Sequence, residues 1–104
     1  MNIELIHERV HAGNYLVKNH AVYHALKEDF ELKHMIEAIL NGRIIEEYPD
    51  DQRVLICGSI TSQEKRLLYL HIVCECSDPV YIEIVTAYIP NGSQWENPPF
   101  RRRK

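Results

Sequence analysis

Apolar and polar residues follow two different periods along this chain, and the period changes once, before the middle. Ahead of the change, apolar residues recur at i, i+3, i+4, i+7 and i+8: Leu32, Met35, Ile36, Ile39 and Leu40. That spacing places them on one face of an α-helix. From Arg43 onward, apolar residues tend to alternate with polar ones, as they do in β-strands. The sequence therefore predicts helices first and strands afterwards.

Two helices are predicted before the change. The first covers residues 15–28, and its apolar surface consists of Leu16, Val22, Tyr23 and Leu26. The second carries the apolar face just described and ends at Asn41 and Gly42, where a glycine suits a left-handed cap. Residues 1–13 are ambiguous, because Ile3, Ile6 and Val10 recur at helical spacing but Ala12, Gly13 and Asn14 break the pattern.

Four strands are predicted after the change, at residues 43–48, 53–61, 67–76 and 80–89, with polar connections at 49–51, 62–66 and 77–79. Strands joined in succession by short turns form an antiparallel meander. The expected fold class is α+β, with two helices packed on one face of a four-stranded antiparallel sheet. Residues 1–104 fit a single domain. The basic end, residues 97–104, is expected to be a mobile tail.

The third predicted strand has two different faces. Leu68, Leu70, Ile72, Cys74 and Cys76 form an apolar face that should meet the helices. The other face carries His71 at its centre, between Tyr69 and Val73, and should stay open. In the fourth strand, simple alternation buries the side of Thr86 and Tyr88. A β-bulge near the end of that strand would reverse the assignment, so both orientations stay open.

Composition is that of a globular domain. Hydrophobic residues make up 45% and charged residues 26% of the 104 residues, as in average soluble domains. We expect a cytoplasmic protein without a membrane anchor, because no apolar run approaches the ~20 residues of a membrane span and the start lacks a signal-peptide pattern. The three cysteines, Cys57, Cys74 and Cys76, are expected to be buried free thiols rather than metal ligands.

The net charge of -3 is unevenly distributed. Four of the twelve Lys and Arg residues stand at positions 101–104, which leaves eight against fifteen acidic residues elsewhere. An acidic body does not indicate general nucleic-acid binding. The tail has two interpretations, a contact to phosphate groups or a solvated terminus.

His20, His24 and Lys27 lie at i, i+4 and i+7, on one stripe of the first predicted helix. Three interpretations remain open: a solvated helix face, an acid–base pair with a lysine for a phosphate, or half of a zinc site. A metal-binding regulator would combine His20 and His24 with the similarly spaced His7 and His11. His71 does not extend such a site to the cysteines, because it points away from Cys74. No phosphate loop or nucleophile elbow is present.

Several stretches together resemble one family. They are "NHAVYHAL", "IEAILNGRIIEEYPDD", "LHIVCE" and "IVTAYIPNGSQW", followed by terminal arginines. In this order they are similar to the small prokaryotic family called domain of unknown function 4258. That family resembles the RelE-like toxins and the barnase–colicin ribonucleases, which cleave RNA without metal. The resemblance implies a cognate antitoxin of the small zinc-finger type as the partner, and RNA or a ribosome as the target.

Carried over to this chain, the resemblance implies a metal-independent endoribonuclease toxin without a cofactor. His20 and His71 would be its acid and base, Thr86 and Tyr88 would contact phosphate, and Lys27 would be a weaker phosphate contact. Members of that family more often carry an arginine on the first helix, and Arg43, Arg53 or the tail would have to substitute for it here. The alternative is a non-catalytic module that binds a protein on the open sheet face through its aromatic residues: Tyr69, His71 and either Tyr81 or Tyr88.

Overall fold

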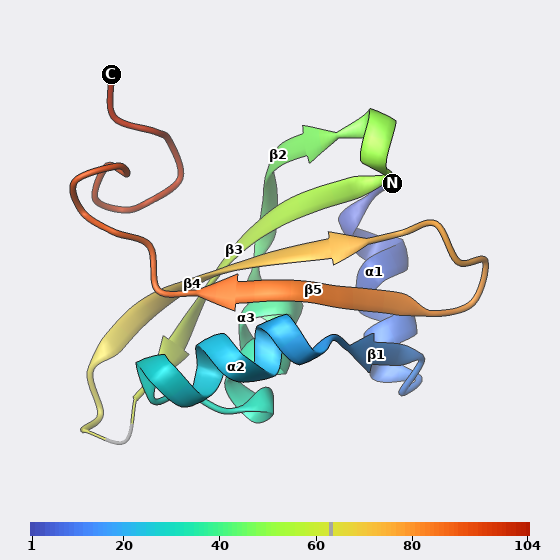
Figure 1. The fold of residues 1–104 in the computed structure, drawn as a ribbon, viewed down its shortest axis with the longest axis horizontal. Coiled ribbons are helices and arrows are strands. Elements are labelled where there is room, and N and C mark those ends of the chain that lie inside the picture. The colour runs from blue at the N-terminus through green and yellow to red at the C-terminus, as the bar shows by residue number, and fades with distance from the viewer. Residues whose placement is uncertain (63) are drawn as a thin grey trace.

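A computed structural model describes residues 1–62 and 64–104. Helices and strands follow in the order that Figure 1 shows: α1 (Ile3–His11), β1 (Tyr15–Val17), α2 (Asn19–Glu28), α3 (Leu32–Asn41), β2 (Arg43–Tyr48), the 3-10 turn η1 (Pro49–Asp51), β3 (Arg53–Thr61), β4 (Leu67–Glu75) and β5 (Ile82–Tyr88). The α+β class is confirmed. The predicted connection at residues 62–66 includes residue 63, which lies outside the described residues.

The strands form one sheet in the order β1-β5-β4-β3-β2. From β2 to β5 it is the predicted antiparallel meander. The prediction of two helices and four antiparallel strands is wrong in two elements, because the sheet also contains β1, which pairs with β5 in parallel, and α1 is a further helix. The apolar residues of β1 were assigned to a helix, although three residues suffice for a strand when a distant strand supplies the hydrogen bonds.

All three helices contribute to a core on one face of the sheet. The core joins Ile6 and Val10 of α1, Ala21 and Ala25 of α2 and Met35, Ala38 and Ile39 of α3 to the alternate residues of β3, β4 and β5. In β4 these are Leu70, Ile72 and Cys74, the face that the sequence predicted. Among the described residues, no helix is long and apolar enough to cross a membrane.

Glycines allow α3 to lie close to β3. A Cβ atom at Gly58 would stand 1.8 Å from the backbone oxygen of Ala38, well inside contact distance. A Cβ atom at Gly42 would stand 2.4 Å from the same oxygen. The predicted left-handed cap at Gly42 is wrong, because its φ is -88°. Close packing, rather than backbone conformation, requires that glycine.

A bulge settles the orientation of the end of β5. Val73 pairs with Thr86 but the next residue, Cys74, pairs with Ile84, so Val85 is an extra residue. Beyond the bulge, Ala87 joins the core, and Thr86 and Tyr88 turn to the face of His71. β2 has a similar shift between Ile44 and Glu46. The chain after β5 crosses toward this second face as an irregular segment (Figure 1).

Candidate functional site

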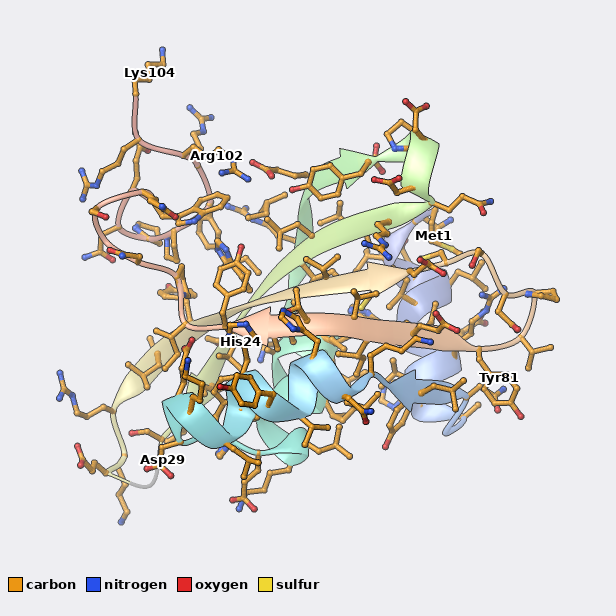
Figure 2. All side chains as sticks on the ribbon, viewed as in Figure 1. Met1, His24, Asp29, Tyr81, Arg102 and Lys104 are labelled. Carbon is orange, nitrogen blue, oxygen red and sulfur yellow. The ribbon has the colours of Figure 1, made fainter. Side chains whose placement is uncertain are left out.

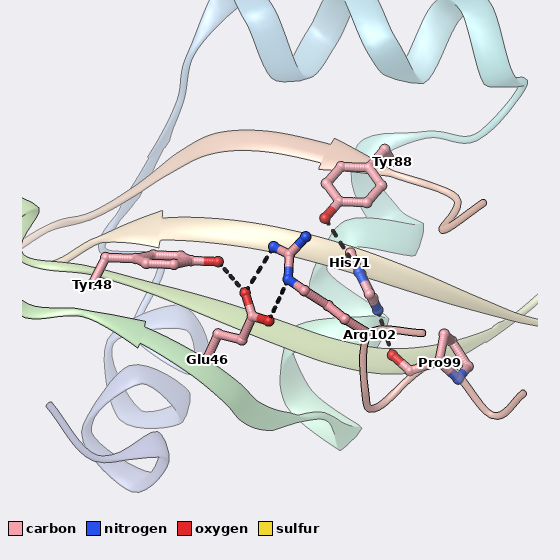
Figure 3. A network of polar contacts seen from close by, with 6 residues as sticks. All are labelled: Glu46, Tyr48, His71, Tyr88, Pro99 and Arg102. Atoms are coloured by element: carbon pink, nitrogen blue, oxygen red, sulfur yellow. Dashed lines mark hydrogen bonds and ion pairs between the residues drawn. The ribbon is translucent and has the colours of Figure 1, made fainter. Parts of the chain in front are cut away.

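His71 stands at the centre of the second face and is wholly buried, with 0% of its surface exposed. Its Nε2 lies 2.7 Å from the carbonyl oxygen of Pro99. Because a carbonyl can only accept, Nε2 must carry the proton and donate. Nδ1 of the neutral ring therefore accepts from the hydroxyl of Tyr88, 3.3 Å away (Figure 3). The edge contact with Trp95, at 4.4 Å between ring centroids, completes the surroundings.

Burial lowers the pKa of His71 below its ordinary value, and the hydrogen bond to Pro99 and the charge of Glu46 oppose the shift. The imidazole is therefore neutral at pH 7 in this arrangement. Burial also raises the pKa of Tyr88 to about 12. Both shifts favour the neutral forms of the two side chains.

A second polar cluster lies beside His71 on the same face. The Nε of Arg102 donates to Oε2 of Glu46 at 2.8 Å, and its Nη2 donates to Oε1 at 3.0 Å. The hydroxyl of Tyr48 donates to the same carboxylate. These contacts are drawn in Figure 3. The hydrogen bond from Arg102 is the main cause that lowers the pKa of Glu46, which keeps the carboxylate ionised at neutral pH. Burial, followed by the contact with Glu46, raises the pKa of Tyr48.

Residues 90–104, which we call the C-terminal cap, lie over the part of the second face around His71. Trp95 is 2% exposed and forms an isolated bridge with Arg102, whose guanidinium lies 4.6 Å from the centre of the indole. The Phe100 ring lies 3.8 Å from the guanidinium carbon of Arg43 and packs edge-on against Tyr69. The tail expected to be mobile thus has specific partners on the sheet, while its mobility stays a prediction.

The structure brings together some of the predicted site residues. His71 and Tyr88 are in contact, and Thr86 lies on the same face, opposite Val73 on β4. Tyr81, part of the alternative binding surface, lies before β5, at the far end from the cap, as Figure 2 shows.

His20 and Lys27 are placed elsewhere, exposed on α2. The His20 ring packs against that of His24 at 4.7 Å, and Lys27 lies over the ring of Tyr23. Among the described residues, neither is a hydrogen-bonding or ring partner of His71. His20 and His71, the pair predicted to be the acid and the base, are thus not in contact with each other.

Sequence reasoning missed the cluster of Glu46, Tyr48 and Arg102. Glu46 and Tyr48 stand in the stretch "RIIEEY" of β2, where alternation alone does not tell which glutamate faces the sheet centre. The bulge at Ile45 decides this. Arg102 belongs to the basic tail, for which the sequence indicates a phosphate contact or a solvated terminus, and no local pattern indicates its contact with β2.

Within the described parts of the chain, no group of three or more His, Cys, Asp or Glu side chains is placed to hold a metal ion. The histidines offered for a metal-binding regulator have other surroundings. His7 bonds to the backbone oxygen of Ile39, and His24 lies 3.8 Å from Glu28. All three cysteines are free thiols, with Cys57 and Cys74 buried.

Apolar side chains are exposed on the opposite side of the molecule. A groove of about 260 Å³ lies between α2 and α3, and Val22, Leu26 and Leu32 belong to its lining. Leu26 is 78% exposed, which is unusual for a leucine on a helix that packs on a sheet. A contiguous apolar surface of this kind is typical of a contact with another protein.

One family model matches the chain, and its description reads Domain of unknown function (DUF4258). The match covers residues 17–89, from the end of β1 to the residue after β5. It therefore includes Arg43, Glu46, His71 and Tyr88 and leaves the C-terminal cap outside. No curated protein and no solved structure is similar enough to match.

Proposed function

The chain belongs to the family named domain of unknown function 4258 (DUF4258), whose model matches most of its length, and from that premise we propose that it is a metal-independent endoribonuclease. The observation that carries the proposal is the set of acid–base groups on one sheet face. Glu46, His71 and Tyr88 come from three different strands, and Glu46 lies close enough for its charge to act on the imidazole. The carboxylate of Glu46 can act as a general base, the imidazole of His71 as a general acid, and the guanidinium of Arg43 can stabilise negative charge, so RNA cleavage at this site needs no metal.

The chemistry follows from the character of each group. The ionised Glu46 is the base that takes the proton of a ribose 2′-hydroxyl, whose oxygen then attacks the adjacent phosphorus. The bond from phosphorus to the 5′-oxygen breaks, and that oxygen receives a proton from His71. The products are a 2′,3′-cyclic phosphate and a 5′-hydroxyl. The imidazole must be protonated to act as the acid. The step therefore requires that His71 becomes exposed to water, so that the charge of Glu46 can raise its pKa.

The remaining groups on the face contact the phosphate. Arg43 supplies a positive charge for the oxygens of the pentavalent phosphorus, and the hydroxyls of Thr86 and Tyr88 donate hydrogen bonds to them. Lys27, on α2, stays a candidate for a contact to a flanking phosphate, and His20 has no role in this scheme. The base is Glu46 rather than His20, because Glu46 shares a sheet face with His71.

RNA cleavage by the purified protein in excess EDTA tests the proposal, with protein in excess over RNA and with and without ribosomes. Loss of a general acid or base lowers a rate by roughly 10²- to 10⁴-fold, so Glu46→Gln and His71→Gln should both reduce cleavage to that extent. His20→Ala is the matched control and should keep more than half of the activity. Equal rates for wild type and Glu46→Gln would contradict the proposed site.

A second candidate function rests on the groove between α2 and α3. Its exposed apolar side chains favour a protein-binding role, and a cognate antitoxin, such as a small zinc-finger protein, is the partner that a toxin would require. The alternative of a binding module on the open sheet face stays a prediction, and the cap contacts Tyr69 and His71 of that face. Leu26→Ser would abolish partner binding without affecting cleavage, whereas Glu46→Gln would do the reverse.

A further inference from the structure

We propose that the C-terminal cap, residues 90–104, is autoinhibitory and competes with single-stranded RNA for the second sheet face. This inference rests on the proposed function, because it concerns access to the same site. It goes beyond that function by assigning a role to a segment outside the residues that match the family.

Four cap residues, Trp95, Pro99, Phe100 and Arg102, engage groups assigned to RNA cleavage. The Pro99 carbonyl accepts the Nε2 proton of His71, and the Trp95 ring covers the same imidazole. Phe100 lies over the guanidinium of Arg43. Arg102 forms a two-point ion pair with the carboxylate of Glu46. A substrate needs all of these groups, so it cannot occupy the face while the cap is seated.

The cap offers the sheet the chemistry that a nucleotide would offer. Indole and phenyl rings stand where bases would stack, because aromatic and guanidinium groups are common stacking partners of unpaired bases. The carbonyl of Pro99 takes the position of an oxygen acceptor at His71. Removal of the cap would uncover Tyr69, His71 and Tyr88, three rings on adjacent strands, next to the positive charge of Arg43.

Among the residues that the structure describes, the cap is attached to the sheet by side-chain contacts and not by strand pairing, which would allow it to dissociate. Apart from one bridge within the cap itself, between Trp95 and Arg102, no regular strand secures it in the described structure. Arg101, Arg103 and Lys104 are exposed at its end, and Figure 2 shows Lys104 projecting away from the body. Phosphate groups attract such side chains. RNA is therefore the ligand expected to draw the cap off the site as it binds.

Phe100→Ala is the variant that loosens the cap without changing a group assigned to the reaction. Ser93, also in the cap, is exposed and bonds to Asn91 only through its backbone N–H, so Ser93→Ala is the matched control. The accessibility of Trp95, the only tryptophan, to acrylamide reports cap opening. Binding of a 2′-O-methyl oligonucleotide, which cannot be cleaved through the 2′-oxygen, reports access to the face. Because apparent affinity scales with the open fraction, we expect about fivefold to tenfold tighter binding in Phe100→Ala and unchanged binding in Ser93→Ala.

Greater quenching of Trp95 in Phe100→Ala without tighter RNA binding would overturn the proposal. If Phe100→Ala changes neither property, Trp95→Ala decides, and unchanged RNA binding in that folded variant also overturns it. Tighter binding without cleavage by any form supports competition by the cap and refutes the ribonuclease. If wild type cleaves RNA as fast as Phe100→Ala and Trp95→Ala do, the ribonuclease proposal stands and autoinhibition is refuted.

Discussion

Substitution of His71 by alanine should destabilise the fold far more than the same change at His20, the other histidine predicted to act in the reaction. His71 is 0% exposed. Its removal takes away a ring that packs against Trp95 and the hydrogen bond that the Pro99 carbonyl accepts from Nε2. A buried carbonyl without a partner costs about 1–3 kcal/mol. Loss of a buried aromatic ring costs about 3–5 kcal/mol in comparable cores.

These contributions overlap, because the cap can partly collapse into the space. We therefore expect about 3–5 kcal/mol less unfolding free energy for His71→Ala. His20 is exposed on α2, so His20→Ala should change the free energy by less than about 0.5 kcal/mol. Urea denaturation followed by far-ultraviolet circular dichroism measures both values. The fluorescence of Trp95, followed in the same titration, shows whether the cap separates before the fold does.

A loss below about 1 kcal/mol in His71→Ala would refute the reasoning, because surface substitutions lie in that range. It would mean that His71 is exposed in solution and that the cap is mostly open. A large loss has a consequence for the nuclease assay. Activity lost in His71→Ala would then reflect unfolding as well as chemistry, which is why the milder His71→Gln is the variant for kinetics.

Three further predictions concern stability and charge. Gly58→Ala should cost at least about 3 kcal/mol, because its Cβ would meet the backbone of α3, whereas Gly92→Ala, with nothing within 4 Å, should change little; thermal denaturation compares them. Burial lowers the pKa of His71 in the folded protein, so below the ordinary histidine pKa of about 6.5 the unfolded chain binds more protons than the folded protein. Acidification from about pH 7.5 to about pH 5.5 should therefore destabilise wild type relative to His71→Gln, by up to about 1.4 kcal/mol for each pH unit below the ordinary pKa. Arg102→Ala should cost only about 0–1 kcal/mol, because the side chain is 58% exposed, yet raise the pKa of Glu46, which carbon-detected NMR titration of the carboxyl would reveal.

The local pattern of apolar residues was enough to predict β2, β3 and α3. β2 and β3 have the predicted bounds, 43–48 and 53–61, because a period of two between turn residues specifies a strand. The helix predicted for 32–41 is α3 for the same reason at helical spacing. β1 could not be found this way. Its residues form a strand only because β5, far along the chain, offers an edge.

The candidate site depended on features without a local pattern. Alternation placed His71 on the face away from the helices, but it did not reveal that the end of the chain covers that face. The side of Thr86 and Tyr88 depended on one extra residue, Val85, at a bulge. Simple parity would have buried both hydroxyls against the helices. A bulge was anticipated as an alternative, and the pairing between β4 and β5 decides for it.

The cap was the least predictable part. Residues 90–104 contain no period of two or of 3.6 and have four basic residues at the end, a composition typical of a solvated terminus. Trp95 and Phe100 contact ring and guanidinium partners on the sheet. Only three-dimensional contacts of this kind tell an irregular covering segment from a free tail.

The identity of the RNA products tests the proposed ribonuclease most directly. Folded protein, in excess EDTA and with Phe100→Ala assayed beside wild type, should cut RNA to leave a 2′,3′-cyclic phosphate and a 5′-hydroxyl. A single 2′-deoxy nucleotide at the cleaved position should block the reaction, because Glu46 would have no hydroxyl to deprotonate. Cleavage that survives the 2′-deoxy substitution, or that occurs only when Mg²⁺ is added, would contradict the proposed chemistry.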